Sequence, residues 1–125
     1  MAPVGMVSQF PRLYEGVQQD SITGATTSTV GQVFEMPADW NGQPTVLDWE
    51  ILFPGSAPAS LSVQLEGSDD SSFPTASTFI LDGPYTTTTA TVRFVINKPK
   101  RFVRANLTAI GSNSVTVRLK NSGKQ

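Results

Sequence analysis

The chain contains neither cysteine nor histidine among its 125 residues. Without cysteine, no disulfide or thiolate-bound metal can hold the fold, so packing and backbone hydrogen bonds must do so. Without histidine, the commonest general base and metal ligand is missing. The sequence also lacks a phosphate-binding glycine loop, zinc-ligand spacing and a dinucleotide-binding fingerprint. We therefore expect a protein that is not an enzyme and that uses no cofactor.

Long apolar runs are absent as well. No stretch approaches the ~20 apolar residues of a membrane span, and the first residues lack the basic start and apolar run of a secretory signal. With a sequence pI of about 5.2, the chain also lacks the strongly basic character of nucleic-acid-binding domains. We expect folding inside the cell, with no membrane and no nucleic acid as partner.

Charge is divided unevenly along the chain. All ten carboxylates lie between Glu15 and Asp82, and Arg12 is the only cationic residue before residue 83, so residues 1–82 carry a net charge of −9. Residues 83–125 carry +8 and contain no carboxylate. Two interpretations are open: acidic and basic strands neutralise each other within one fold, or a basic surface meets an acidic surface on another copy or a partner.

Alternation of apolar and polar residues is the dominant pattern, and no window of a dozen residues has helical spacing. Apolar residues occupy every second position of Thr45–Phe53. Similar runs are Ser60–Glu66, Thr78–Leu81, Ala90–Asn97, Phe102–Ile110 and Ser114–Lys120. Clusters of Gly, Pro, Asn and Asp separate these runs. The pattern predicts an all-β chain, a single two-sheet antiparallel β-sandwich, jelly-roll-like, of about eight strands.

The alternation also predicts which side chains face the core. We expect the inward set to be Leu47, Trp49, Ile51, Phe53, Leu61, Val63, Leu65, Phe94, Val103, Ala105, Leu107, Val115 and Val117. Gly111-Ser112-Asn113 has the composition of a tight hairpin turn, so we expect the last two strands to pair with each other.

The first 30 residues have no convincing hydrophobic face of their own. We expect residues 1–30 to be an extended N-terminal arm or edge segment, and residues 31–125 to form the sandwich. Sizeable apolar side chains in this segment are then candidates for contact with a neighbouring subunit or another protein, namely Met6, Phe10, Leu13 and Tyr14.

Carboxylates cluster at Asp69-Asp70, with Glu66 nearby and Asp82 further along. Such a group is compatible with a calcium site or a glycosidase-like pair. We favour a third interpretation, in which Gly67–Ser71 is a turn whose aspartates accept hydrogen bonds from backbone amides. No metal site is expected.

Two further groups are candidate binding residues. Trp40, in the turn of residues 37–42, and Tyr85 stand where a sugar-binding platform would lie, although a loop tryptophan also commonly closes the end of a sandwich. The second group, here called the basic group, gathers five cations in a short stretch: Arg93, Lys98, Lys100, Arg101 and Arg104. These cations either lie on a solvated face or pair with carboxylates of another subunit.

Three segments carry a resemblance to a known family: Ser60–Phe73 (SLSVQLEGSDDSSF), Arg101–Ala109 (RFVRANLTA) and Ser114–Leu119 (SVTVRL). They resemble small β-sandwich virion proteins of tailed bacteriophages, most closely capsid decoration (cement) proteins. The resemblance implies a structural protein made in the host cytoplasm that binds the outside of an assembled capsid. It also implies contact with the major capsid protein, a dimer or trimer of this chain, and no catalytic residues.

Two other functions remain open. A carbohydrate-binding module would use Trp40 or Tyr85, and a phage tail or baseplate component would share the fold without contacting the capsid.

Overall fold

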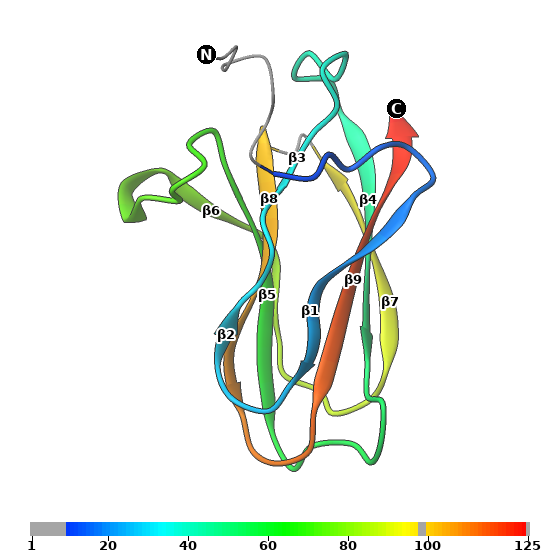
Figure 1. Cartoon of the computed structure of the whole chain (residues 1–125), viewed down its shortest axis with the longest axis vertical. Coiled ribbons are helices and arrows are strands. Elements are labelled where there is room, and N and C mark those ends of the chain that lie inside the picture. Colours follow the sequence, from blue (N-terminus) through cyan, green and yellow to red (C-terminus); the bar gives the residue numbers. More distant parts are fainter. Residues whose placement is uncertain (1–9, 98–99, 125) are drawn as a thin grey trace, which may run out of the picture.

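The computed structural model describes residues 10–97 and 100–124, which form two antiparallel sheets facing each other (Figure 1). Sheet B consists, in spatial order, of β1 (Gln18–Ala25), β9 (Val115–Lys124), β4 (Thr45–Leu52) and β7 (Thr91–Asn97). Sheet A consists of β2 (Thr29–Val30), β8 (Phe102–Ile110), β5 (Leu61–Ser68) and β6 (Thr78–Tyr85), with β3 (Phe34–Glu35) also pairing with β8. A 3₁₀ helix, Thr75–Ser77, precedes β6. The predicted all-β, two-sheet sandwich is confirmed.

The chain crosses from one sheet to the other after most strands, and β5 and β6 are consecutive strands that pair directly. This is the strand order of a jelly roll. The prediction that Gly111–Asn113 joins two paired strands is wrong, because β8 and β9 belong to different sheets. Figure 1 shows this connection at the lower end of the sandwich. Positive φ at Ser112 and Asn113 provides a sharp bend, but a bend does not determine which strands pair.

The core lies between the sheets and follows the predicted alternation in β4, β5, β8 and β9. The predicted core residues of these strands are buried, and Phe53, just beyond β4, is half-buried against them. Core residues outside the expected set are Leu13, Ile22, Phe34, Met36, Val95 and Leu119, of which Leu119 continues the alternation of Val115 and Val117.

The predicted orientation of β7 is wrong. Phe94 is 64% exposed, whereas its neighbour Val95 is buried. Apolar residues occupy both faces of this strand, so alternation alone did not determine the inward face. The orientation shown by the structure turns Arg93 towards the other sheet, where its guanidinium pairs with Asp82 of β6.

From Phe10 onward, the segment expected to be an arm or edge segment lies along the sandwich. β1 is the edge strand of sheet B and pairs with β9. Before it, the backbone of Arg12 bridges to Glu35, and that of Glu15 bridges to Asn121. Residues 10–25 therefore belong to the same packed unit as the rest of the sandwich.

Candidate binding site at the Trp40 end of the sandwich

Trp40 is held by a tight turn between β3 and β4. Its backbone N–H donates to the carbonyl of Pro37 (2.9 Å), and its indole Nε1–H donates to the carbonyl of Gln43 (2.9 Å). Asn41 and Gly42 both have positive φ, and the Gln43 N–H donates to the Trp40 carbonyl. These are the features of a type I′ turn, which an Asn-Gly pair favours. The turn thus fixes the position of the indole, which also packs against the core.

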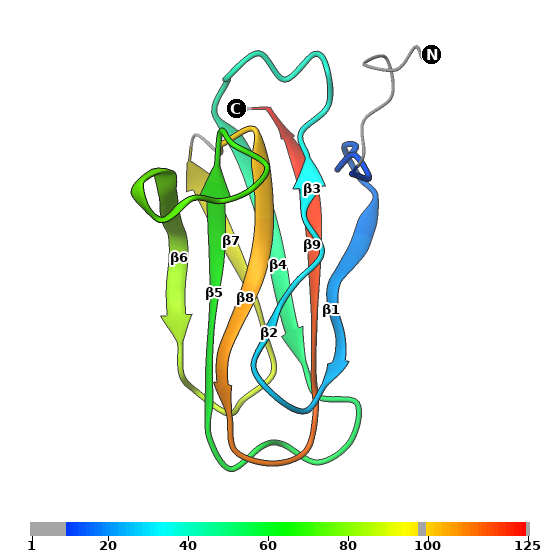
Figure 2. The ribbon, with the colours of Figure 1, turned by 60° about the vertical axis from the view of Figure 1, so that its left-hand side comes forward.

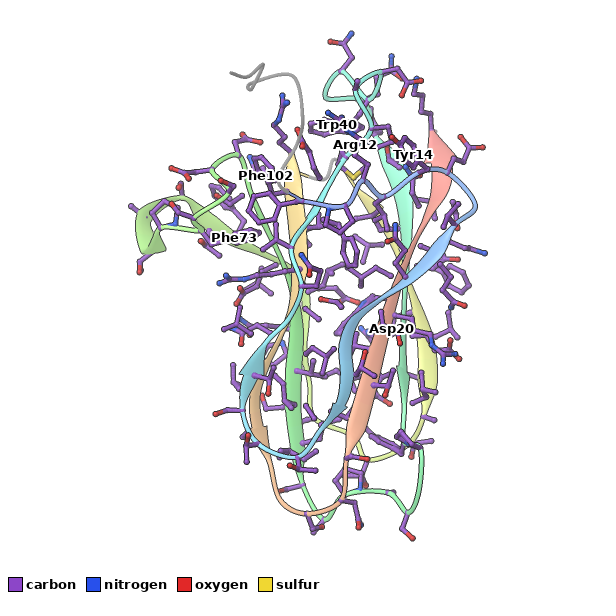
Figure 3. The ribbon with its side chains drawn as sticks, viewed as in Figure 1. Arg12, Tyr14, Asp20, Trp40, Phe73 and Phe102 are labelled. Atoms are coloured by element: carbon purple, nitrogen blue, oxygen red, sulfur yellow. The ribbon has the colours of Figure 1, made fainter. Side chains whose placement is uncertain are left out.

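Two hollows are lined by this tryptophan. The first, of about 250 Å³, and the second, of about 320 Å³, both have Trp40 in their walls. The first is lined by Tyr14, Glu15, Pro37, Asp39, Trp40, Thr45, Asn121 and Lys124. The second is lined by Met36, Pro37, Ala38, Trp40, Asn41, Gly42 and Arg101. Figure 3 places Trp40 and Tyr14 at the same end of the molecule.

The first hollow combines aromatic rings with polar side chains from distant parts of the sequence. Tyr14 is 55% exposed, and Lys124 and Asp39 form a loose ion pair (3.7 Å). Asn121 is buried, donating from its amide to the Leu13 carbonyl and accepting from the Gly123 N–H. A rigid indole beside carboxylates and hydroxyl or amine donors suits the apolar face and hydroxyl groups of a sugar ring.

Sequence reasoning identified Trp40 but missed its neighbours. Glu15, Asn121 and Lys124 come to the hollow because the chain before β1 runs beside the end of β9, as the Glu15–Asn121 bridge shows. Nothing in the sequence marks that pairing, since 106 positions separate the two residues.

The structure does not bring Tyr85 to this site. Its hydroxyl donates to the Thr89 carbonyl (2.8 Å), and the Arg93 guanidinium lies 5.3 Å from its ring centre. Tyr85 is the last residue of β6 and packs against the core, and it lines none of the hollows at the Trp40 end. The two aromatic candidates are therefore separate.

The four apolar residues proposed for partner contact have different environments. Leu13 is fully buried in the core of its own chain, so its proposed role in contacting a partner is wrong. Phe10 packs edge-to-face on Phe102, with ring centres 5.9 Å apart. Tyr14 is exposed and lines the first hollow. Met6 lies outside the described residues.

The basic group is paired within the chain. Arg93 contacts Asp82 (2.8 Å) and Arg101 contacts Glu35 (2.7 Å), while Lys100 lies 4.0 Å from Asp69. Lys98 is outside the described residues. Every cation in the described ranges, including those outside the basic group, lies within 4.0 Å of a carboxylate.

The remaining member, Arg104, belongs to the most buried ionic network on the outer face of sheet A. Its Nε–H donates to Glu66 Oε1 (2.9 Å), and its guanidinium lies 4.0 Å from the ring centre of Phe73. Glu66 Oε2 accepts hydrogen bonds from the amides of Gln64 (2.6 Å) and Asn106 (2.8 Å). Burial alone would raise the pKa of Glu66, but these hydrogen bonds and the positive charge lower it on balance.

A second ionic contact bridges the two sheets. Asp82 accepts two hydrogen bonds from Arg93 and one from the indole Nε1–H of Trp49 (2.8 Å). The bonds from Arg93, together with the weaker effect of Trp49, hold the pKa of Asp82 below its ordinary value despite partial burial.

The Asp69-Asp70 cluster has the capping role favoured by its sequence. Asp70 Oδ1 accepts from the N–H and the hydroxyl of Ser72, which lowers the pKa of Asp70. Asp69 Oδ1 accepts from the backbone N–H of Arg101. Within residues 10–97 and 100–124, no three histidine, cysteine or carboxylate side chains gather in a way that could hold a metal ion.

Comparison with known proteins identifies no relative. No family model, no curated protein and no solved structure matches this chain. Among the described residues, no helix is long and apolar enough to cross a membrane.

Proposed function

We propose that this chain is a non-catalytic structural protein of a phage virion, which binds the outside of an assembled capsid and stabilises the shell. The strand order carries the proposal, because jelly rolls occur in viral capsid domains as well as in lectins. The resemblance of its sequence to capsid decoration proteins supports the same role, with the major capsid protein as partner and a homo-oligomer as the bound form.

The surface chemistry favours docking through apolar rather than ionic contacts. The cations of the described residues are already paired within the chain, whereas several large apolar side chains are exposed. These are Tyr14, Val17, Val30, Phe79, Ile80, Val92 and Phe94. A few buried anchors, aromatic residues such as Tyr among them, provide most of the binding energy at protein interfaces.

The experiment adds purified protein to capsids that have been stripped of it. Occupancy is measured by electron microscopy, and heat resistance by the temperature at which the particles release their DNA. We expect saturable binding to the capsid and a higher release temperature. Particles that are equally heat-resistant with and without the protein would reject the reinforcing role, and binding confined to tails would assign the chain to the tail or baseplate.

The Trp40 hollow supports a second candidate, a carbohydrate-binding module. Here we expect purified glycans to quench tryptophan fluorescence and Tyr14→Ala to weaken that binding. Tyr14→Phe is the matched control, because it keeps the ring and removes only the hydroxyl. Glycan binding without any particle binding would favour this function over the first.

A further inference from the structure

The two sheets are open, and their edge strands differ in how well they are protected against pairing with another chain. An edge strand exposes unpaired backbone N–H and C=O groups and can template a further strand. Bulges, proline, charged side chains on the edge, inward-pointing charges and short length all oppose such pairing. The edges here are β1 and β7 in sheet B, and β2, β3 and β6 in sheet A.

Four of these five edge strands carry such protection. The pairing of β1 with β9 has two register irregularities, and so has the pairing of β6 with β5. Pro84 lies within β6. On the opposite side of sheet A, β2 and β3 have two residues each. None of these strands offers a long, regular edge.

β7 has no bulge and no proline, and it is not short. It pairs with β4 in continuous register over seven residues, Thr91–Asn97, and this stretch contains neither Pro nor Gly. Its one charged residue, Arg93, points inward, but Asp82 of the same chain neutralises this charge. The outward side chains Val92 and Phe94 are 46% and 64% exposed. Figure 1 shows β7, in yellow, at the right-hand margin of the ribbon.

We infer that β7 binds the same strand of a second copy of this chain, antiparallel, so that sheet B continues across a two-fold axis. Such an axis perpendicular to the sheet keeps each side chain on its own face, so one residue must lie opposite itself. Full overlap of Thr91–Asn97 makes that residue Phe94, the midpoint of the strand. Aromatic pairs directly opposite one another stabilise antiparallel strands.

Charge explains why a second copy fits this edge. Self-pairing brings like residues together, and the outward face of β7 has no charge to repel its own image. The carboxylates on the adjacent strand are already paired, Asp48 with Lys120 (3.6 Å) and Glu50 with Arg118 (4.0 Å). Because pairing of one strand makes a small interface, dimerisation should depend on protein concentration.

The test measures the mass of the full-length protein by sedimentation equilibrium over a concentration series. We expect the mass to rise from 13.4 kDa towards twice that value. Phe94→Lys and Val92→Lys should remain monomeric throughout. Val30→Lys is the matched control, because it places the same charge at a 55% exposed residue of β2 and should leave dimerisation unchanged. Circular dichroism verifies that each variant is folded.

The absence of cysteine allows a second measurement. Opposed residues in antiparallel strands have Cα atoms about 4.5–5.5 Å apart, within the range that a disulfide spans. Phe94→Cys should therefore form a disulfide-linked dimer on mild oxidation much faster than Val30→Cys. Equal cross-linking rates, a monomeric wild type, or a Phe94→Lys variant that associates like the wild type would each overturn the inference.

This inference rests on the fold alone and not on the proposed function. A dimer that has no affinity for capsids would reject the proposed function but leave β7 pairing intact. A protein that reinforces capsids yet stays monomeric would reject β7 pairing but leave the proposed function intact.

Discussion

Trp49 and Phe94 are both aromatic residues on strands with alternating apolar positions, yet their environments are opposite. Trp49 is fully buried, and its indole N–H reaches Asp82. Phe94 lies on the neighbouring strand, opposite Asp48, and points out of the sandwich. A buried tryptophan needs a partner for its N–H, and Asp82 provides it here.

Because of these environments, truncating the two side chains to alanine should lower the free energy of unfolding by different amounts. Trp49→Ala should lower the free energy of unfolding by about 3–5 kcal/mol, as large-to-small core substitutions do. Phe94→Ala should change it by no more than about 0.5 kcal/mol in dilute protein, because its side chain is largely exposed. Urea denaturation measures both values. Similar losses for the two variants would contradict the orientation of β7.

A second prediction concerns how Glu66 affects the stability of the protein in acid. Because its pKa is lower in the folded chain than in the unfolded one, its contribution to stability is complete above the ordinary glutamate pKa of about 4.3. That contribution is lost as the pH falls through the lower folded-state pKa. Wild type should therefore lose stability over this acid range more steeply than Glu66→Gln in urea titrations. Parallel pH profiles would show that Glu66 is not the group responsible.

Which strands pair with each other determines whether an ion pair is buried or exposed. Arg104 of β8 and Glu66 of β5 are opposite each other in sheet A, and both side chains are largely buried. Arg118 of β9 pairs with Asp20 of β1 on the outer face of sheet B, where both side chains are more than a third exposed. Asp20 is labelled on β1 in Figure 3.

The two arginines should differ in importance although both form ion pairs. Removing one member of a buried pair costs about 3–5 kcal/mol, because the other charge stays buried without it. An exposed pair contributes about 0–1 kcal/mol. Arg104→Ala should thus lower the melting temperature far more than Arg118→Ala. The interpretation of Glu66–Arg104 as a buried structural pair fails if the two variants melt together.

Strand positions could be predicted from the sequence more readily than strand partners. Alternation identified the inward faces of β4 and β5 because carboxylates, Asp48 and Glu50 in β4 and Glu66 in β5, mark the opposite face of each strand. It failed for β7, whose inward Arg93 makes sense only with Asp82 in place on the other sheet. Of the residues that line the Trp40 hollow, the sequence identified only Trp40 as a candidate for ligand binding. Others reach the hollow because the segment before β1 pairs with β9, which the sequence does not reveal.

Across the whole molecule, the uneven division of charge is resolved by the strand order. In sheet B the basic strand β9 lies between β1 and β4, which carry carboxylates. In sheet A, β8 with Arg104 lies beside β5 with Glu66. Figure 2 shows β5 and β8 side by side. Halves of opposite charge along the chain thus become interleaved strands, and the first of the two interpretations, neutralisation within one fold, describes the structure.

This internal neutralisation leads to a prediction for docking to a capsid. If the basic group acted at the rim of an interface, salt would slow association steeply, because such charges act on the encounter rate and are screened within about 8–10 Å at ordinary ionic strength. Since Arg101 is instead bound to the buried carboxylate of Glu35, we expect the association rate to vary little with salt.

Arg101→Glu should lower the melting temperature, because it places a second carboxylate beside Glu35, and leave the association rate unchanged. Stopped-flow light scattering with stripped capsids measures the rate across a salt series, and calorimetry measures the melting temperature. A rate that falls steeply with salt, and falls again on Arg101→Glu without any loss of stability, would return the basic group to the docking surface.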